Sequence, residues 1–245
     1  MTTTPKWAKK RVESGAVIEE TIYLEGHAPG LVKGNTKTAD EKRSENRNRR
    51  IRDLTRLINA NFAAGDGFAR LSYSGLAYTR LREGLPPKTK ASPYVYTQAQ
   101  ETIKRFLRQC EYRCAKMGIP LRYVYITSNI KGATGHYARI HHHLIVNREA
   151  ITLVRTLWDA GKTHVAPLED QPDYRPLAAY MLQQVPFVPG KRNYSHSNDL
   201  EKPIQHTRYL TDPNEPLHAP TGAQILRSYP NYLSYTYPKP TSDAD

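Results

Sequence analysis

The segment RIHHHLIV, Arg139 to Val146, places three consecutive histidines directly before a run of apolar and β-branched residues. Because such a run is typical of a β-strand, we expect alternate side chains to point to opposite faces of a sheet. His141 and His143 then share one face, roughly 7 Å apart along the strand, and His142 takes the other. Two such imidazoles can bind one metal ion when a third ligand contributes. A purification tag or a solvated histidine cluster is the alternative, but the segment is internal and continues into an apolar strand.

Composition limits the classes of protein to which the chain can belong. The 245 residues are enough for one elaborated domain or two small ones, and the formal net charge is +13. A basic excess of this size favours a polyanionic partner, nucleic acid first and an anionic membrane surface second. The sequence shows no apolar run long enough to cross a bilayer and no signal peptide, so we expect a cytoplasmic protein without a membrane partner.

The cysteines and tyrosines narrow the classes further. Cys110 and Cys114 lie one helical turn apart with no second pair, which supports neither a disulfide framework nor a zinc finger and predicts reduced thiols. The 17 tyrosines provide apolar area with a polar tip, and their rings can stack on bases. Both features agree with a cytoplasmic protein that binds nucleic acid.

From Asn46 onward, the hydrophobic spacing alternates between the periods of helices and strands. Three-and-four spacing predicts helices over residues 46–62, 96–117, 149–158 and 173–184. Alternation and β-branched runs predict strands over residues 68–74, 121–127, 139–146 and 162–165. No strand-helix-strand series indicates a parallel sheet, so we expect an α+β fold.

Composition divides the chain into three predicted regions. Residues 1–45 show little periodicity and many charged or small polar residues, so we expect a poorly ordered or loosely packed arm, with short extended pieces at residues 16–18 and 21–24. Residues 46–205 contain the periodic segments and form the predicted domain. Residues 206–245 are rich in proline and tyrosine and are expected to form a C-terminal tail.

Basic side chains gather on two of the predicted helices and next to the histidines. Arginines in the first half of the helix at 46–62 oppose the helix macrodipole, so local stability does not explain them. A solvated helix face is one interpretation, and contact with nucleic-acid phosphates is the other. The candidate DNA-binding residues are Arg47, Arg49, Arg50, Arg52, Lys104, Arg105, Arg108 and Arg139.

Three motifs, in this order along the chain, resemble those of the HUH endonucleases, the single-tyrosine initiator (Rep) proteins of rolling-circle replication in phages, plasmids and integrated elements. Phe68 to Tyr73 is similar to the first strand of the family. Arg139 to Val146 is similar to its histidine-hydrophobic-histidine metal strand, with His142 in the middle, non-ligand position. Leu177 to Leu182 is similar to its nucleophile helix, with Tyr180 as the nucleophile. A core tyrosine on that helix is the alternative interpretation of Tyr180.

The resemblance covers residues 46–205 and implies a five-stranded antiparallel sheet of RRM-like type, with helices packed on it and the histidine strand in the centre. It implies a divalent metal ion, Mn²⁺ or Mg²⁺, bound by His141 and His143. It also implies phosphodiester transesterification, in which Tyr180 nicks DNA to give a 5′-phosphotyrosine and a free 3′-hydroxyl. The substrate would be single-stranded or hairpin DNA at a replication origin in the cytoplasm of a bacterial host, with a host helicase and polymerase as partners.

Two positions depart from the family pattern. Gln183 stands where a lysine usually follows the nucleophile by three residues, so Lys191 or Arg192 is expected to supply the missing charge. Ser128 stands where a glutamate usually ends the strand before the histidines. A hydroxyl is a poor substitute for a carboxylate ligand, so His136, in the segment leading to the metal strand, becomes the candidate third ligand. Water or a DNA phosphate is the alternative.

Two other functions fit the same residues. An HUH transposase or relaxase shares the chemistry but acts in transposition or conjugation. A catalytically degenerate RRM-like module would bind nucleic acid, with its tyrosines as stacking platforms. The two departures favour the degenerate module, whereas the histidine pair and Tyr180 oppose it. A covalent phosphotyrosine adduct with DNA would distinguish the enzyme from the module.

The charge predicts that binding to single-stranded DNA weakens steeply with salt. Each lysine or arginine that contacts a phosphate releases a counterion, which gives a logarithmic slope of about −0.7 per contact. With a few contacts, the dissociation constant of a labelled oligonucleotide should rise at least about tenfold between roughly 50 and 200 mM salt. A dissociation constant that stays the same over this range would contradict the predicted phosphate contacts.

Overall fold

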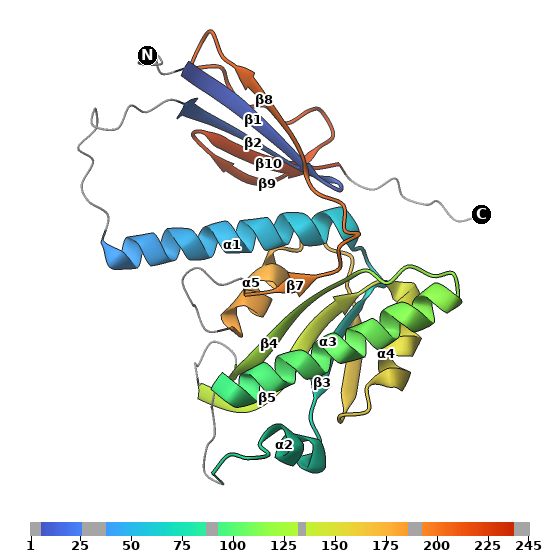
Figure 1. The fold of residues 1–245 in the computed structure, drawn as a ribbon. Helices are drawn as coiled ribbons and strands as arrows, with labels where there is room; N and C mark the ends of the chain where they lie inside the picture. Colours follow the sequence, from blue (N-terminus) through green and yellow to red (C-terminus); the bar gives the residue numbers. More distant parts are fainter. Residues whose placement is uncertain (1–5, 26–37, 87–92, 132–135, 186–192, 238–245) are drawn as a thin grey trace, which may run out of the picture. The chain divides into compact units, whose positions relative to one another are not determined.

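The computed structural model describes residues 6–25, 38–86, 93–131, 136–185 and 193–237, which fold into an α+β structure (Figure 1). The chain divides into two compact units. Unit one comprises Met1–Asn61, Pro172–Arg175 and Glu201–Asp245, and unit two comprises Phe62–Gln171 and Pro176–Leu200. Each unit contains a five-stranded antiparallel sheet. In the described part of the chain, no helix is long and apolar enough to cross a membrane.

Unit one joins the two ends of the described chain in one sheet. Its strands, in the order β8-β1-β2-β10-β9, are β1 (Lys6–Ser14), β2 (Val17–Glu25), β8 (Ile204–Tyr209), β9 (Gln224–Tyr229) and β10 (Tyr232–Thr236). α1 (Ala39–Asn61) packs beside this sheet, and Arg56 of the helix forms an ion pair with the buried Glu19 of β2. Gly15 makes the hairpin turn with a φ of +60°, and a Cβ there would lie 2.2 Å from the backbone oxygen of Asn59.

The three predicted regions are wrong in their boundaries. The expected arm, residues 1–45, instead contains the β1–β2 hairpin and the first turns of α1. The expected tail, residues 206–245, contains most of β8 and all of β9 and β10. The expected domain at 46–205 divides between the units. Two of these strands lack a clear apolar alternation for different reasons. In β2 a buried position holds Glu20, which is 5% exposed and whose carboxylate lies 3.0 Å from Lys9 Nζ, whereas β8 is exposed along its whole length.

Unit two has the histidine strand at the centre of its sheet. The order β6-β3-β5-β4-β7 comprises β3 (Gly67–Ser72), β4 (Tyr123–Lys131), β5 (His136–Val146), β6 (Thr163–Pro167) and β7 (Ser195–His196). All neighbouring strands run antiparallel. The predictions of an antiparallel five-stranded sheet and of a central histidine strand are confirmed, whereas the RRM-like type of the sheet stays a prediction.

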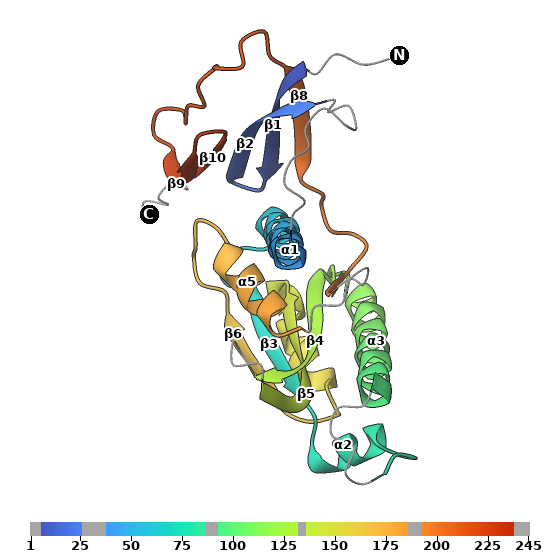
Figure 2. The ribbon, with the colours of Figure 1, turned by 90° about the vertical axis from the view of Figure 1, so that its left-hand side faces the viewer.

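Helices lie on both faces of the unit-two sheet (Figure 2). α3 (Pro93–Lys116) and α4 (Ile151–Leu157) pack on one face. α5 (Arg175–Gln183) lies on the opposite face. The remaining helical segments are α2 (Gly75–Leu81), which follows β3, and the 3₁₀ turn η2 (Arg148–Ala150) before α4. The four predicted helices are confirmed within a few residues, except that α1 starts seven residues earlier than expected.

The core of unit two lies between the sheet and α3, and it includes one histidine. Leu71 of β3 and Leu144 of β5 are fully buried there. His142 points into the same core, with Nε2 2.8 Å from Tyr73 Oη and Nδ1 3.0 Å from Thr127 Oγ1. Burial lowers the pKa of His142 to about 3, so its ring is neutral and its two hydrogen bonds offset the cost of desolvation.

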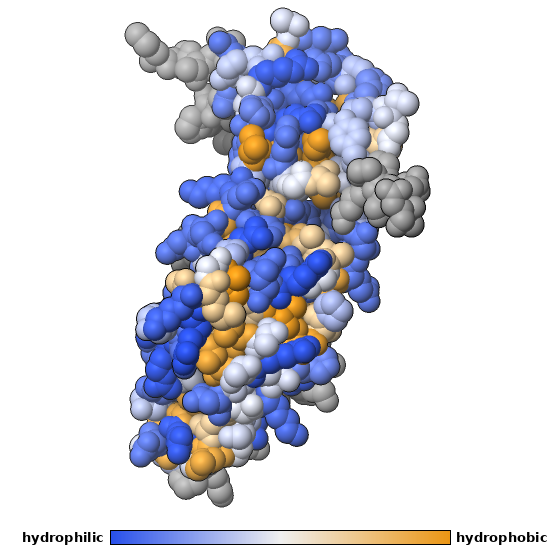
Figure 3. All heavy atoms as spheres, turned by 90° about the vertical axis from the view of Figure 1, so that its right-hand side faces the viewer, coloured by the Kyte–Doolittle hydropathy of each residue, from blue (hydrophilic) through white to orange (hydrophobic). Residues whose placement is uncertain are grey.

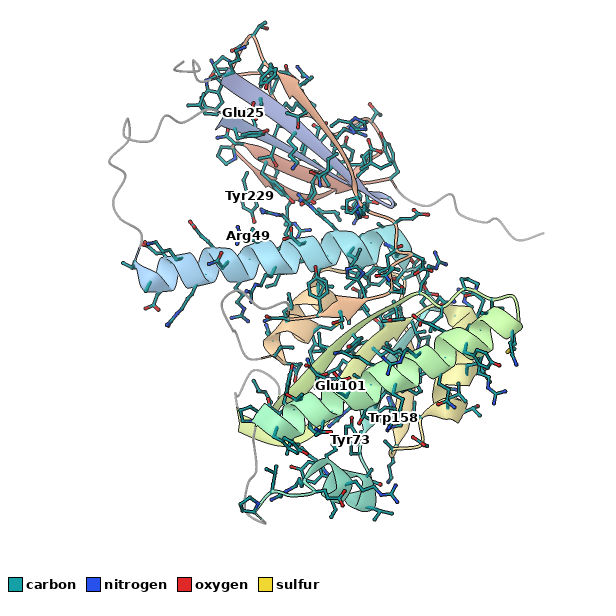
Figure 4. All side chains as sticks on the ribbon, in the orientation of Figure 1. Glu25, Arg49, Tyr73, Glu101, Trp158 and Tyr229 are labelled. Atoms are coloured by element: carbon teal, nitrogen blue, oxygen red, sulfur yellow. The ribbon has the colours of Figure 1, made fainter. Side chains whose placement is uncertain are left out.

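Aromatic rings complete this core. Tyr73 and Trp158, which are labelled in Figure 4, meet edge to face with ring centroids 5.4 Å apart. Cys110 and Cys114 of α3 are buried beside them as free thiols, as predicted. In Figure 3, hydrophilic side chains cover most of the visible surface and apolar side chains form patches among them. This surface agrees with the high net charge of the chain.

Two backbone segments approach each other so closely at Gly161 that we expect a side chain there to destabilise unit two. A Cβ at Gly161 would lie 2.1 Å from the backbone oxygen of Ser72 and 2.6 Å from the backbone nitrogen of Ser74. These segments are joined by the hydrogen bond from Ser72 N to Lys162 O, at 2.9 Å, so they cannot separate freely. Gly161→Ala should therefore lower the free energy of unfolding of unit two by about 1–3 kcal/mol.

Urea unfolding followed by the fluorescence of Trp158, in a Trp7→Phe background, measures this change within the full chain because the two tryptophans belong to different units. Gly75→Ala is the matched control, since a Cβ there would meet nothing within 4 Å. Alanine in place of a helical glycine should leave stability unchanged or raise it slightly. Equal midpoints for the two variants would contradict the expected clash.

Candidate active site

His141 and His143 lie on the same face of β5, as the strand period predicts. Their Nε2 atoms are 3.2 Å apart, and their ring centroids are 4.9 Å apart with an angle of 78° between the planes. Both side chains are buried, with only 4% and 3% of their surface exposed. The two nitrogens therefore converge on one point, and we name these residues the histidine pair.

The donor chemistry of the histidine pair fits a divalent metal ion. Nδ1 of His141 lies 2.9 Å from the carbonyl oxygen of Arg139. Because a carbonyl only accepts, Nδ1 carries the proton and Nε2 keeps its lone pair. Burial lowers the pKa of both rings, that of His143 to about 3, so both are neutral at pH 7. Two nitrogens on one tetrahedral zinc ion would lie about 3.3–3.4 Å apart, close to the observed separation.

The same distance also fits a hydrogen bond between the two rings. In that arrangement Nε2–H of His143 would donate to Nε2 of His141. Nδ1 of His143 is buried and has no hydrogen-bond partner among the described residues. A metal ligand at Nε2 would require the proton to move to Nδ1, so the two interpretations differ in one proton position on His143.

The described side chains do not include the third metal ligand that was expected beside His141 and His143. Ser128 lies directly across from His141 on β4, but its hydroxyl donates to the carbonyl oxygen of Gln184 at 2.6 Å. Within the described residues, no three His, Cys, Asp or Glu side chains are close enough together to hold a metal ion. His136 is the first residue of β5, but its side chain lies outside the described part of the structure, so its role stays a prediction.

Helix α5 places Tyr180 at the histidine pair. The ring of Tyr180 meets that of His143 edge-on, with centroids 5.5 Å apart, and lies 6.1 Å from the ring of Phe68. Phe68 in turn stacks on His143, with centroids 5.5 Å apart and planes 4° apart. Tyr180 is 43% exposed, whereas Ala178 and Met181 on the same helix are fully buried. This exposure does not fit the alternative of a core tyrosine.

The sequence explains why a helix begins where it can present this tyrosine. The carboxylate of Asp173 accepts a hydrogen bond of 3.1 Å from the backbone nitrogen of Arg175, which satisfies one of the free donors of the first turn. Pro176 is tolerated there because it lacks only a donor that the helix does not need. Leu177 is half-buried one turn before the buried Met181, so α5 packs its apolar residues against the protein, while Tyr180 stays partly exposed beside the histidine pair.

The predicted supporting residues are only partly described. Gln183 is exposed on the last turn of α5, one turn after Tyr180. Lys191 and Arg192, which were expected to replace the charge missing at Gln183, lie outside the described residues. Their contribution to the site therefore stays a prediction.

Sequence reasoning missed a cation beside the histidine pair. Arg70 of β3 is the direct cross-strand partner of His143. Its side chain is exposed and belongs to the same face of the strand as Phe68. The main cause of the lowered pKa of both rings in the histidine pair is burial, but the positive charge of Arg70 lowers it further. The strand alternation in the sequence places Arg70 on a face with Phe68, but only the register between strands brings it to His143.

The predicted DNA-binding residues lie on separate elements. Arg47, Arg49 and Arg52 are exposed on α1 in unit one, and Arg50 of that helix is half-buried. Lys104, Arg105 and Arg108 are exposed on α3 in unit two, on the face of the sheet opposite to the histidine pair. These last three residues are therefore not brought to the candidate active site.

Two of the α3 cations form a distinct groove. Arg105 and Arg108 line a hollow of about 450 Å³ together with Arg80 of α2. Glu101 and Asp159 also line it, so the groove has mixed charge. Figure 4 labels Glu101, whose carboxylate lies 2.8 Å from Nζ of Lys104.

Arg139 occupies the strand of the histidine pair but is held by other contacts. Its Nη2 donates to the carbonyl oxygen of Ser74 at 2.9 Å, and its guanidinium lies 4.5 Å from the centroid of the Tyr78 ring. Its carbonyl oxygen accepts from His141, so the backbone of Arg139 orients one ring of the pair.

Comparisons of the chain with protein-family models, with curated proteins and with solved structures found no match. The similarity to HUH endonucleases therefore depends on the three motifs alone. Their residues Phe68, His143 and Tyr180 come from three separate segments and meet in one cluster of rings.

The convergence of the histidine pair predicts a measurable metal site. His141→Ala and His143→Ala should each lower the affinity for Mn²⁺, measured by calorimetry on the full chain, by at least about tenfold, since even residues behind a ligand contribute 10–100-fold. His206→Ala, an exposed imidazole on β8, is the control and should bind as the wild type does.

The variant His136→Ala tests the third ligand in the same experiment. A loss equal to that of His143→Ala would support His136 as a ligand. Wild-type affinity for His136→Ala, with a loss for His143→Ala, would place the third ligand elsewhere. Wild-type affinity for His143→Ala would contradict the metal site itself.

Proposed function

We propose that this protein is a metal-dependent, single-tyrosine DNA endonuclease and strand transferase of the HUH type, which initiates rolling-circle replication by nicking single-stranded DNA. The observation that carries the proposal is the placement of an exposed Tyr180 against His143 of the histidine pair. A nucleophile, two metal-ligand candidates and a nearby cation on one sheet face are the parts that phosphodiester transesterification requires.

Tyr180 carries the covalent step. Its hydroxyl oxygen forms a bond to the phosphorus of the scissile phosphodiester, and the bond from phosphorus to the 3′-oxygen breaks. The leaving 3′-oxygen takes up a proton, and the 5′-phosphate stays on the tyrosine. One phosphodiester is exchanged for another, so a 3′-hydroxyl can attack the phosphotyrosine and rejoin the strand without an external energy source.

The surrounding residues prepare this step. A divalent ion bound by His141 and His143 would stabilise the charge that develops on the non-bridging oxygens of the phosphate. The hydroxyl of Tyr180 must lose its proton as its oxygen attacks, and the exposure of the side chain leaves that proton accessible to water. Phe68 stacks on His143 and packs against Tyr180, so it fixes the orientation of both rings.

The chemistry also indicates the partners. The 3′-hydroxyl released by the nick is the end that a polymerase extends, and the strand displaced by extension requires a helicase. The sequence has no glycine-rich phosphate-binding motif of the P-loop type, so we assign the unwinding to a helicase of a bacterial host. The DNA substrate would be the single-stranded or hairpin segment of a replication origin, in the cytoplasm of that host.

Two alternative functions use the same site. A transposase or relaxase would perform the same step in transposition or conjugation. A catalytically degenerate nucleic-acid-binding module is favoured by Gln183 and by Ser128, whose hydroxyl is engaged with a backbone carbonyl and does not replace a carboxylate ligand. The module predicts DNA binding without a covalent adduct.

Removal of one hydroxyl separates the enzyme from the binding module. A pool of random single-stranded oligonucleotides, labelled at the 3′ end and incubated with Mn²⁺, should give an SDS-resistant labelled protein, because the fragment after the nick stays on the tyrosine. Tyr180→Phe should reduce this adduct to background. Its DNA affinity should change only a few-fold, since one hydrogen bond contributes about 0.5–1.5 kcal/mol.

Tyr112→Phe is the control, because Tyr112 is similarly exposed, at 57%, on α3 across the sheet. It should form the adduct at the wild-type rate. An adduct that persists in Tyr180→Phe would show that another residue is the nucleophile. No adduct with the wild type, despite DNA binding, would favour the degenerate module.

A further inference from the structure

We propose that Arg70 binds the non-bridging oxygens of the DNA phosphate held at the histidine pair, and so supplies the positive charge that Gln183 cannot. The inference rests on the proposed function for the position of the phosphate. It names a further residue of the candidate site, contributed by β3 and not by α5 or the segment that follows it.

The strand register places Arg70 at the site. Arg70 lies directly opposite His143 across the β3–β5 ladder, and Ser72 lies opposite His141. The Cβ atoms of residues opposite each other in an antiparallel pair are about 4.5–5.5 Å apart, and their side chains project from the same face. The side chain of Arg70 therefore leaves the strand next to the imidazole of His143, the ring that Tyr180 contacts.

The side chain of Arg70 also lacks a polar partner within the described part of the chain. No ion pair or hydrogen bond joins its side chain to any residue that the structure describes, and the side chain is exposed. By contrast, Arg139 donates to the carbonyl oxygen of Ser74, and Lys104 pairs with Glu101. An exposed arginine without a carboxylate partner is suited to an anion from outside the protein.

Charge balance gives the anion a specific position. A divalent ion at the histidine pair and the guanidinium of Arg70 repel each other unless a negative group lies between them. A phosphodiester has two non-bridging oxygens, so one can face the ion and the other can accept hydrogen bonds from the planar guanidinium. The arrangement would hold the phosphate from two sides.

The neighbouring strand leaves this position accessible. His164 of β6 lies directly opposite Arg70, so His164, Arg70 and His143 form a row across three strands of one sheet face. β6 is the edge strand, and His164 is exposed. A single DNA strand can therefore reach Arg70 from the edge of the sheet without displacing α5.

The test compares Arg70→Gln, Arg70→Lys and the control Arg113→Gln, which removes the same charge from the last turn of α3 across the sheet. With the 3′-labelled random oligonucleotides and Mn²⁺, Arg70→Gln should slow adduct formation by about 100-fold or more, the loss typical for a removed group that stabilises transition-state charge. Arg70→Lys should recover part of the rate, since it restores charge without the planar fork. Arg113→Gln should keep the wild-type rate.

Two further measurements separate phosphate binding from a structural role. Affinity of Arg70→Gln for Mn²⁺ alone, measured by calorimetry, should equal or exceed that of the wild type, because removing a nearby positive charge cannot weaken a cation site. Binding of fluorescein-labelled oligothymidylate, measured by anisotropy, should lose about 0.7 from its logarithmic salt slope in Arg70→Gln, and nothing in Arg113→Gln. A parallel loss of Mn²⁺ affinity would indicate a damaged site and overturn the inference.

The outcomes also distinguish this inference from the proposed function. If the wild type forms the adduct and Arg70→Gln forms it at the same rate, Arg70 has no such role and the endonuclease proposal stands. If the wild type forms no adduct, the endonuclease proposal fails. The salt slope of oligothymidylate binding then decides whether Arg70 binds a phosphate. A reduced slope in Arg70→Gln then supports phosphate binding by Arg70, and an unchanged slope overturns it.

Discussion

The alternation of side chains along β5 is the constraint on which the candidate site depends. His142 is fully buried, and Tyr73 and Thr127 hydrogen-bond its two ring nitrogens. Because the side-chain period of a strand is two, anchoring His142 in the core directs His141 and His143 to the opposite face. A slip of one residue would bury two imidazoles in the apolar core and leave one outside. The hydrogen bonds of the buried His142 therefore help to determine which face carries the histidine pair.

The second support of the site is the end of α5. Ser128, opposite His141, donates its hydroxyl to the carbonyl oxygen of Gln184, just after the helix. The last carbonyls of a helix lack partners within it, so this bond satisfies one of them and joins the end of the helix to β4. The serine at the position where the resemblance implies a glutamate thus positions the helix that carries Tyr180.

The features predicted from the sequence are local, and those it missed are not. Spacing within one segment predicts the histidine strand and the helix of Tyr180, because each pattern repeats over a few residues. The pairing of β1 with β8 joins residues near opposite ends of the chain, and β8 has no buried face whose alternation could reveal it. In β2, the buried Glu20, paired with Lys9 of β1, interrupts the apolar pattern. The position of Arg70 depends on how β3 aligns with β5. That alignment is a property of the folded sheet and not of either segment.

Under the proposed function, the charges of the site bear on how it would hold a metal ion without a carboxylate. The two imidazoles of the histidine pair carry no negative charge, and the Arg70 side chain beside them is positive, so these three side chains do not by themselves attract a cation. A cation and a polyanion would then bind more favourably together than separately, because each reduces the repulsion that the other meets. By thermodynamic linkage, the factor by which DNA strengthens metal binding equals the factor by which metal strengthens DNA binding. A site with a glutamate at this position would bind its ion with less dependence on the substrate. In this chain, the phosphate of the DNA would supply the negative charge that a glutamate at the position of Ser128 would otherwise provide.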